Sequence, residues 1–273
     1  MKYQSKSAYS YIMRNFGNLF YVALPVAVLM AFFANPTIEI DFLHKLLFGG
    51  VTMENVFPLF SGAYTVLRFR RFWWVNVIAF VLLAFTVAML IVKISRHMRM
   101  GLMPALPFKR TFSLFPTVFL VMLCYFGISE ILGLLPVGVT YVLRATNNAV
   151  LISVAGVCVD FVVRLLSVWV FMLLVLAFPL KYSENYHFNV GLSYSVRVMT
   201  KLPRPVWTIT LVYVFGRYLV MLCAYFARAV YLDVLIYALC YLFAIVYLPA
   251  FAYKVYHDAV GGERRDLNRT VFD

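Results

Sequence analysis

The sequence predicts an all-α membrane protein with six transmembrane helices, and three observations carry that prediction. The composition is 64% hydrophobic and only 13% charged, whereas soluble domains are about half apolar and a quarter charged. Several apolar runs exceed the roughly 18 residues that a spanning helix requires. Basic residues gather in alternate connections between these runs. We therefore expect one membrane domain over residues 1–273 and no separate soluble domain.

The predicted spans follow one another at about 18–34, 72–94, 114–139, 149–180, 206–228 and 233–254. Three stretches with apolar residues at helical spacing precede the first, third and fifth spans, near 5–18, 101–113 and 189–203. In the first stretch the apolar residues are Tyr9, Ile12, Met13 and Phe16. Such a pattern is typical of an amphipathic helix that lies on the membrane surface.

Residues 35–71 form the longest predicted connection, and they leave the number of spans open. Glu39, Asp41 and Glu54 make this connection too polar to cross a membrane easily, which favours six spans. The alternative is a seventh or re-entrant segment at 46–67. A seventh span would move Arg68, Arg70 and Arg71 to the cytoplasmic side.

The basic residues predict the orientation of the chain. Sixteen of the 24 Lys and Arg lie in the two termini and in the connections at 93–110 and 181–204, whereas six lie on the opposite side. By the positive-inside rule, both termini are cytoplasmic, in the inner (cytoplasmic) membrane of the cell. We interpret the net charge of +13 as topology, with attraction to anionic lipid headgroups of about 1 kcal/mol per basic residue, and expect no nucleic-acid partner.

One spacing recurs in the elbows, as we call the connections after the second, fourth and sixth spans. It consists of Pro179, Tyr186, His187 and Gly191, then Pro249, Tyr256, His257 and Gly261, with a fainter copy in His97 and Gly101. This predicts three parallel repeats of a surface helix plus a transmembrane hairpin, at about 5–94, 101–180 and 189–254, and a basic tail at 255–273. The alternative is that helices leaving a membrane share these residue types, since Gly commonly ends helices.

The elbow after the fourth span carries a family resemblance. Glu184-Asn185, then GLSYSVRVMTK from Gly191 to Lys201, then an apolar run, resembles a broad group of bacterial six-helix membrane proteins. That group includes the membrane domain attached to some glycerophosphodiester phosphodiesterases and related uncharacterised membrane families. Glu184, Ser195, Arg197 and Lys201 fill the acidic, serine and basic places of its elbow. The resemblance implies the six-helix topology and no particular activity, and the sequence contains no counterpart of the soluble phosphodiesterase domain.

Four charged residues inside predicted spans are the candidate polar site: Glu130, Asp160, Arg164 and Arg217. A charge at the bilayer centre costs at least ~2.5–3.5 kcal/mol, so such residues usually face the bundle and have partners. Asp160 and Arg164 are spaced i,i+4 with the acid first, the better order for pairing. We expect Asp160 and Arg217 near the midplane and Glu130 nearer the outer face. The group either binds an anionic headgroup or relays ions, or it is a neutralised network that fixes helix register; the latter is favoured.

Chemistry beyond binding has little support in the sequence. The elbow histidines lie on separate elbows without accompanying carboxylates or cysteines, so we expect no metal site and no cofactor. Motifs such as G-x-S-x-G and H-E-x-x-H are absent. We therefore expect a non-enzymatic protein that interacts with lipids or assists transport. The alternatives are a small-molecule or ion transporter with a path between the repeats, and a scaffold that binds a protein partner through its basic elbows.

Overall fold

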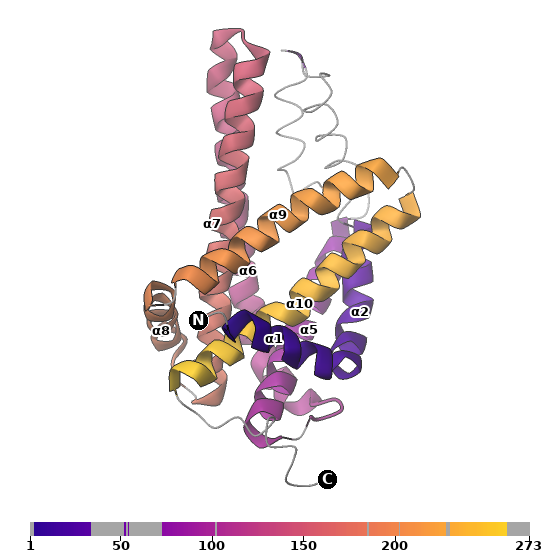
Figure 1. The fold of residues 1–273 in the computed structure, drawn as a ribbon, viewed down its shortest axis with the longest axis vertical. Helices are drawn as coiled ribbons and strands as arrows, with labels where there is room; N and C mark the ends of the chain where they lie inside the picture. Colours follow the sequence, from indigo (N-terminus) through magenta and orange to yellow (C-terminus); the bar gives the residue numbers. More distant parts are fainter. Residues whose placement is uncertain are drawn as a thin grey trace.

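The computed structural model describes residues 3–33, 52, 54, 73–101, 103–184, 186–201, 203–227 and 230–260. Within these ranges the regular elements are all helices, which confirms the predicted all-α class (Figure 1). The α-helices are α1 (Tyr3–Arg14), α2 (Phe16–Phe33), α5 (Trp73–Met100), α6 (Phe108–Leu143), α7 (Ala149–Ser183), α8 (Phe188–Lys201), α9 (Pro203–Ala227) and α10 (Val230–Val260). The predicted connection at 35–71, apart from Thr52 and Glu54, and the tail from Gly261 onward lie outside the described residues.

Four described helices are long and apolar enough to cross a membrane, namely α5, α6, α7 and α10. The pair α1 and α2 counts as a fifth span if the two are taken together, although they meet at 91°. The apolar part of α9 is shorter, over Val206–Val220. These helices indicate a membrane protein, and each of the six predicted spans coincides with one helix.

The turn between α6 and α7 is built from local sequence. A short 3-10 helix, Arg144–Thr146, ends at Asn147, whose φ of 50° is left-handed. Asparagine tolerates this conformation better than most residues. The side chain of Asn148 then accepts a hydrogen bond from the Leu151 backbone N–H and caps the start of α7. The resulting hairpin is long: 36 and 35 residues correspond to about 54 and 52 Å, beyond the ~30 Å of a hydrocarbon core.

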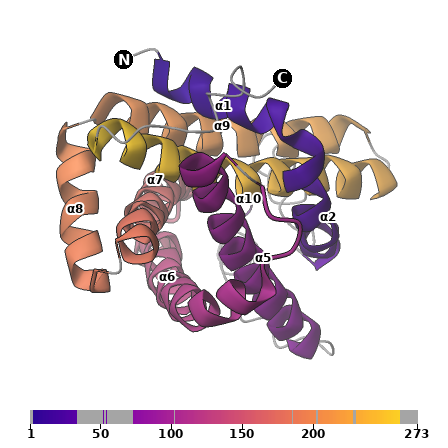
Figure 2. The same cartoon turned by 90° about the horizontal axis from the view of Figure 1, so that it is seen from below.

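The helices pack around a central group of three. Helices α5, α7 and α10 contact one another, and α2, α6 and α9 pack on the outside. Helix α2 packs on α10 and α5, α6 on α5 and α7, and α9 on α7 and α10. Figure 2 shows α5, α6 and α7 side by side, with α8 against α7 at the edge. The turn between α6 and α7 stands at the top of Figure 1, whereas α1, α8 and the end of α10 lie in its lower half.

Two of the three predicted surface helices are separate elements. Helix α1 buries Ala8, Tyr11 and Ile12 and packs on α10. Helix α8 buries one stripe, Gly191, Ser195, Val198 and Met199, and packs on α7. Both helices therefore have the predicted one-sided burial.

The prediction of a surface helix at 101–113 is wrong. Residues 103–107 are not helical, and everything from Phe108 onward belongs to the unbroken α6. Pro107 stands at the N-cap of α6, where its missing N–H costs nothing. Pro116 follows six residues after Arg110 but lies inside α6 without ending it, so one helix includes the basic residues and the apolar run.

Candidate functional site

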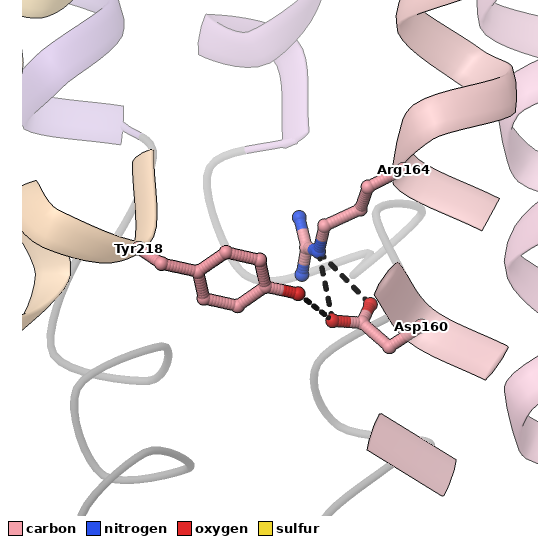
Figure 3. A network of polar contacts seen from close by, with 3 residues as sticks. All are labelled: Asp160, Arg164 and Tyr218. Carbon is pink, nitrogen blue, oxygen red and sulfur yellow. Dashed lines mark hydrogen bonds and ion pairs between the residues drawn. The ribbon is translucent and has the colours of Figure 1, made fainter. Parts of the chain in front are cut away.

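Three residues form a polar network between α7 and α9 (Figure 3). The Arg164 Nε donates to both carboxylate oxygens of Asp160, at 2.9 and 3.0 Å. The Tyr218 hydroxyl donates to Asp160 Oδ2 at 2.5 Å, and the Arg164 guanidinium lies 6.0 Å from the centre of the Tyr218 ring. The i,i+4 pair predicted from the sequence is confirmed, and Tyr218 joins it from the next helix.

The carboxylate at the centre of the network is buried and paired with a cation. Asp160 is only 1% exposed, while the Arg164 side chain is 16% exposed. A buried carboxylate without partners would be strongly destabilising, so Arg164 and Tyr218 supply the compensation that Asp160 needs. Through Tyr218, this buried carboxylate links α7 to α9.

Glu130 and Arg217, the other two candidate residues, lie on α6 and α9. Glu130 is half-buried on α6. The rings of Tyr125 and Phe171 lie 4.9 Å apart across the hairpin, so Glu130, five residues further along, is level with about residue 166 of α7. It therefore lies at nearly the level of Arg164 along the two helices, and its expected position nearer the outer face stays a prediction. Arg217 is part of α9, but its side chain lies outside the described residues.

The elbow residues do not share one environment. His97 and His257 are each 6% exposed, and Tyr256 is 4% exposed. Tyr186 and His187, by contrast, are exposed in the short segment between α7 and α8. The reason is helix length: α7 ends at Ser183, whereas α10 continues to Val260. The equal spacing in sequence is therefore not an equal position in space.

The glycines of the elbows also have different roles. Gly101 has φ 73°, and its N–H donates to the His97 carbonyl at 2.8 Å, so it ends α5 as a left-handed cap. Gly191 lies inside α8, where an added Cβ would be 2.8 Å from the Ala177 carbonyl oxygen. Gly191 is thus needed for close contact between α8 and α7.

Hydrogen bonds tie the elbow ends to distant helices. The Tyr11 hydroxyl and His97 Nδ1 are 3.0 Å apart, which joins α1 to α5. The Tyr256 hydroxyl donates to Glu184 Oε1 at 2.6 Å, which joins α10 to the end of α7. The sequence predicted neither pair, because the partners are 86 and 72 residues apart.

The ends of α5, α7 and α10 meet in a second polar group. The Ser95 and Ser183 hydroxyls are 3.4 Å apart, and Arg99 donates to the Ser183 carbonyl at 3.1 Å. Tyr253 is 1% exposed beside these serines, and its hydroxyl has no hydrogen-bond partner of ordinary length in the described part of the chain. Polar groups at the ends of all three central helices are therefore gathered in one place.

Lys93 secures the connection into α6. Its ammonium donates to the Tyr21 hydroxyl at 2.9 Å and to the Ala105 carbonyl at 2.8 Å. Tyr21 also donates to the Ala105 carbonyl, at 2.9 Å. Lys93 is only 1% exposed, so it acts as an internal tie between α2, α5 and the segment before α6.

No group of three metal-ligating side chains occurs among the described residues. No family model, no curated protein and no solved structure matches this chain. The resemblance to the six-helix group that includes phosphodiesterase membrane domains therefore stays a prediction.

Proposed function

We propose that this chain is a non-enzymatic, multi-pass protein of the inner membrane that interacts with lipids or assists transport. In this proposal Asp160 and Arg164 are its intramembrane polar centre, and the centre holds α9 against α7. The observation that carries the proposal is the buried network of Asp160, Arg164 and Tyr218 in helices whose other faces expose aliphatic side chains. Val154, Val162 and Leu166 on α7 and Leu211, Val212 and Leu219 on α9 are exposed, as lipid-facing residues would be.

The packing pattern supports three units in the membrane. In each proposed unit the first span packs on the last helix of the preceding unit: α2 on α10, α6 on α5, and α9 on α7. Such cyclic closure is what three parallel repeats would produce. Six spans, with α9 included, would then bring both termini to one side.

The distribution of charge supports the cytoplasmic orientation. Most described basic residues lie at the elbow ends of the helices: Arg14, Lys93, Arg96, Arg99, Lys109, Arg110, Lys181, Arg197, Lys201, Arg204 and Lys254. The α6–α7 turn at the other end of the hairpin carries Arg144. This asymmetry is the one that the positive-inside rule predicts for a cytoplasmic elbow side.

The test combines membrane extraction with native mass spectrometry. Membranes that contain the full chain are washed with alkaline carbonate, and the retained protein is then purified in mild detergent. We expect the protein to stay with the membrane and to carry co-purified lipid. Release by carbonate, or a purified protein that carries no lipid, would overturn the proposal. The double variant D160L/R164L should keep its bound lipid, because the centre is assigned a structural role.

A further inference from the structure

Seven phenylalanine rings form a continuous row along α5 and α6, which we call the phenylalanine seam: Phe80, Phe85, Phe108, Phe112, Phe115, Phe119 and Phe126. Phe85 contacts Phe108, Phe112 and Phe115 with ring centroids 6.5, 5.3 and 5.9 Å apart. Phe115 lies 5.7 Å from Phe119. Phe80 lies 5.6 Å from Phe119 and 6.0 Å from Phe126. The row therefore runs between α5 and α6 for more than four turns of α6.

The seam lies at the surface of the protein. Phe108 and Phe112 are 46% and 62% exposed, whereas the other five rings are half-buried. Phe80, Phe115 and Phe119 also pack against the core, so these rings present only an edge to the outside. Aliphatic residues on either side are exposed as well, including Leu82 and Leu120. The exposed edges of the rings and these aliphatic side chains form one apolar strip.

One end of the seam is positively charged. Lys109 and Arg110 follow Phe108 directly in the first turn of α6, and both are exposed. Helix α5 contains no Asp or Glu, and α6 contains none before Glu130. Lys93 holds the preceding segment in place through Ala105, so the start of α6 has a defined position. A row of contacting rings with exposed edges, beside two exposed cations, matches an acyl chain joined to an anionic headgroup.

We infer that the phenylalanine seam, with Lys109 and Arg110, is a binding site for an anionic phospholipid. The acyl chain lies along the rings, and the headgroup phosphate pairs with the two basic side chains. This inference rests on the proposed lipid-interacting function and names the lipid class and the place. Lys109 and Arg110 are adjacent at the end of the rings, so both can pair with one phosphate. We therefore expect this pair, and not basic residues elsewhere on the same side, to carry most of the preference for anionic lipid.

The test uses the full chain in nanodiscs that contain equal amounts of phosphatidylglycerol and phosphatidylcholine, read by native mass spectrometry. We expect the wild type to retain phosphatidylglycerol preferentially and K109Q/R110Q to lose that preference by at least tenfold. The matched control is R197Q/K201Q, which removes two exposed charges from α8 at the same end of the protein. This control should change the preference by less than twofold.

The acyl part of the site is tested separately with F112A. Phe112 is largely exposed, so its removal should preserve folding, and we expect at least threefold less retained lipid of either headgroup. The inference is overturned if the wild type shows no headgroup preference, if both charge variants reduce it equally, or if F112A retains lipid as the wild type does. Lipid that is retained without dependence on the seam would leave the proposed function intact and remove only this site.

Discussion

Replacing Gly191 with alanine tests how α8 is held on α7. A Cβ at this position would lie 2.8 Å from the Ala177 carbonyl oxygen, 3.3 Å from its Cβ and 3.4 Å from its Cα. Ordinary contact begins near 3.4 Å, so α8 would have to move away by about 0.6 Å. Ala177 lies within α7, six residues before its end, and a helix backbone carbonyl cannot move aside as the end of a flexible side chain can.

The expected size of the effect follows from two opposing contributions. Overpacking of this kind costs about 1–3 kcal/mol, and a gap of 0.5–1 Å between packed surfaces loses a quarter to a half of their dispersion attraction. Alanine favours a helix over glycine by about 1 kcal/mol. Gly127→Ala is the matched control, because nothing lies within 4 Å of a Cβ at Gly127 and only the helix preference acts there. We expect G191A to be about 1–3 kcal/mol less stable than G127A.

The assay is reversible unfolding in mixed micelles with increasing SDS, followed by circular dichroism. Trypsin sensitivity of the α8 segment reports detachment of that helix directly and should rise in G191A alone. If G191A and G127A agree within about 0.5 kcal/mol and are cleaved equally, the close approach of α8 to α7 is refuted.

Three further predictions concern single polar groups. Arg164→Leu leaves the buried Asp160 carboxylate without its cation and should cost about 3–5 kcal/mol in SDS unfolding, whereas the double variant D160L/R164L should recover most of that loss; equal losses would exclude a buried pair. Burial raises the pKa of Tyr194 in α8 from 10.0 to about 12, so its contribution to folding is complete below pH 10 and disappears as the pH rises towards 12. The free energy of unfolding between pH 9 and 12 should therefore fall less steeply with pH in Tyr194→Phe than in the wild type. An unchanged slope would mean that Tyr194 is not the group that titrates. Glu184→Gln keeps the shape of the acceptor for Tyr256 but removes its charge, and it should cost about 1 kcal/mol; a stability equal to wild type would mean that the bond contributes nothing.

Much of the fold follows from local sequence. The six predicted spans coincide with helices because an apolar run can satisfy its backbone hydrogen bonds only within itself in a membrane. The pairing of Asp160 with Arg164 was also predictable, since a spacing of four residues places both on one helix face. The repeated spacing of Tyr and His at the elbows did not predict equivalent positions in the structure. Identical spacing cannot reveal that α10 continues past its Tyr256-His257 pair while α7 ends before Tyr186-His187.

The sequence by itself therefore determined the helices, their order and the existence of an internal ion pair, because each depends on residues within a few turns of one another. Only the tertiary structure decided which helices are joined by hydrogen bonds between polar side chains. Tyr218 reaches Asp160 across 58 residues, and Tyr11 reaches His97 across 86. Such contacts depend on crossing angles and on the depth at which one helix meets another. These are set by the packing of whole surfaces, as at Gly191, and not by any local pattern of residues.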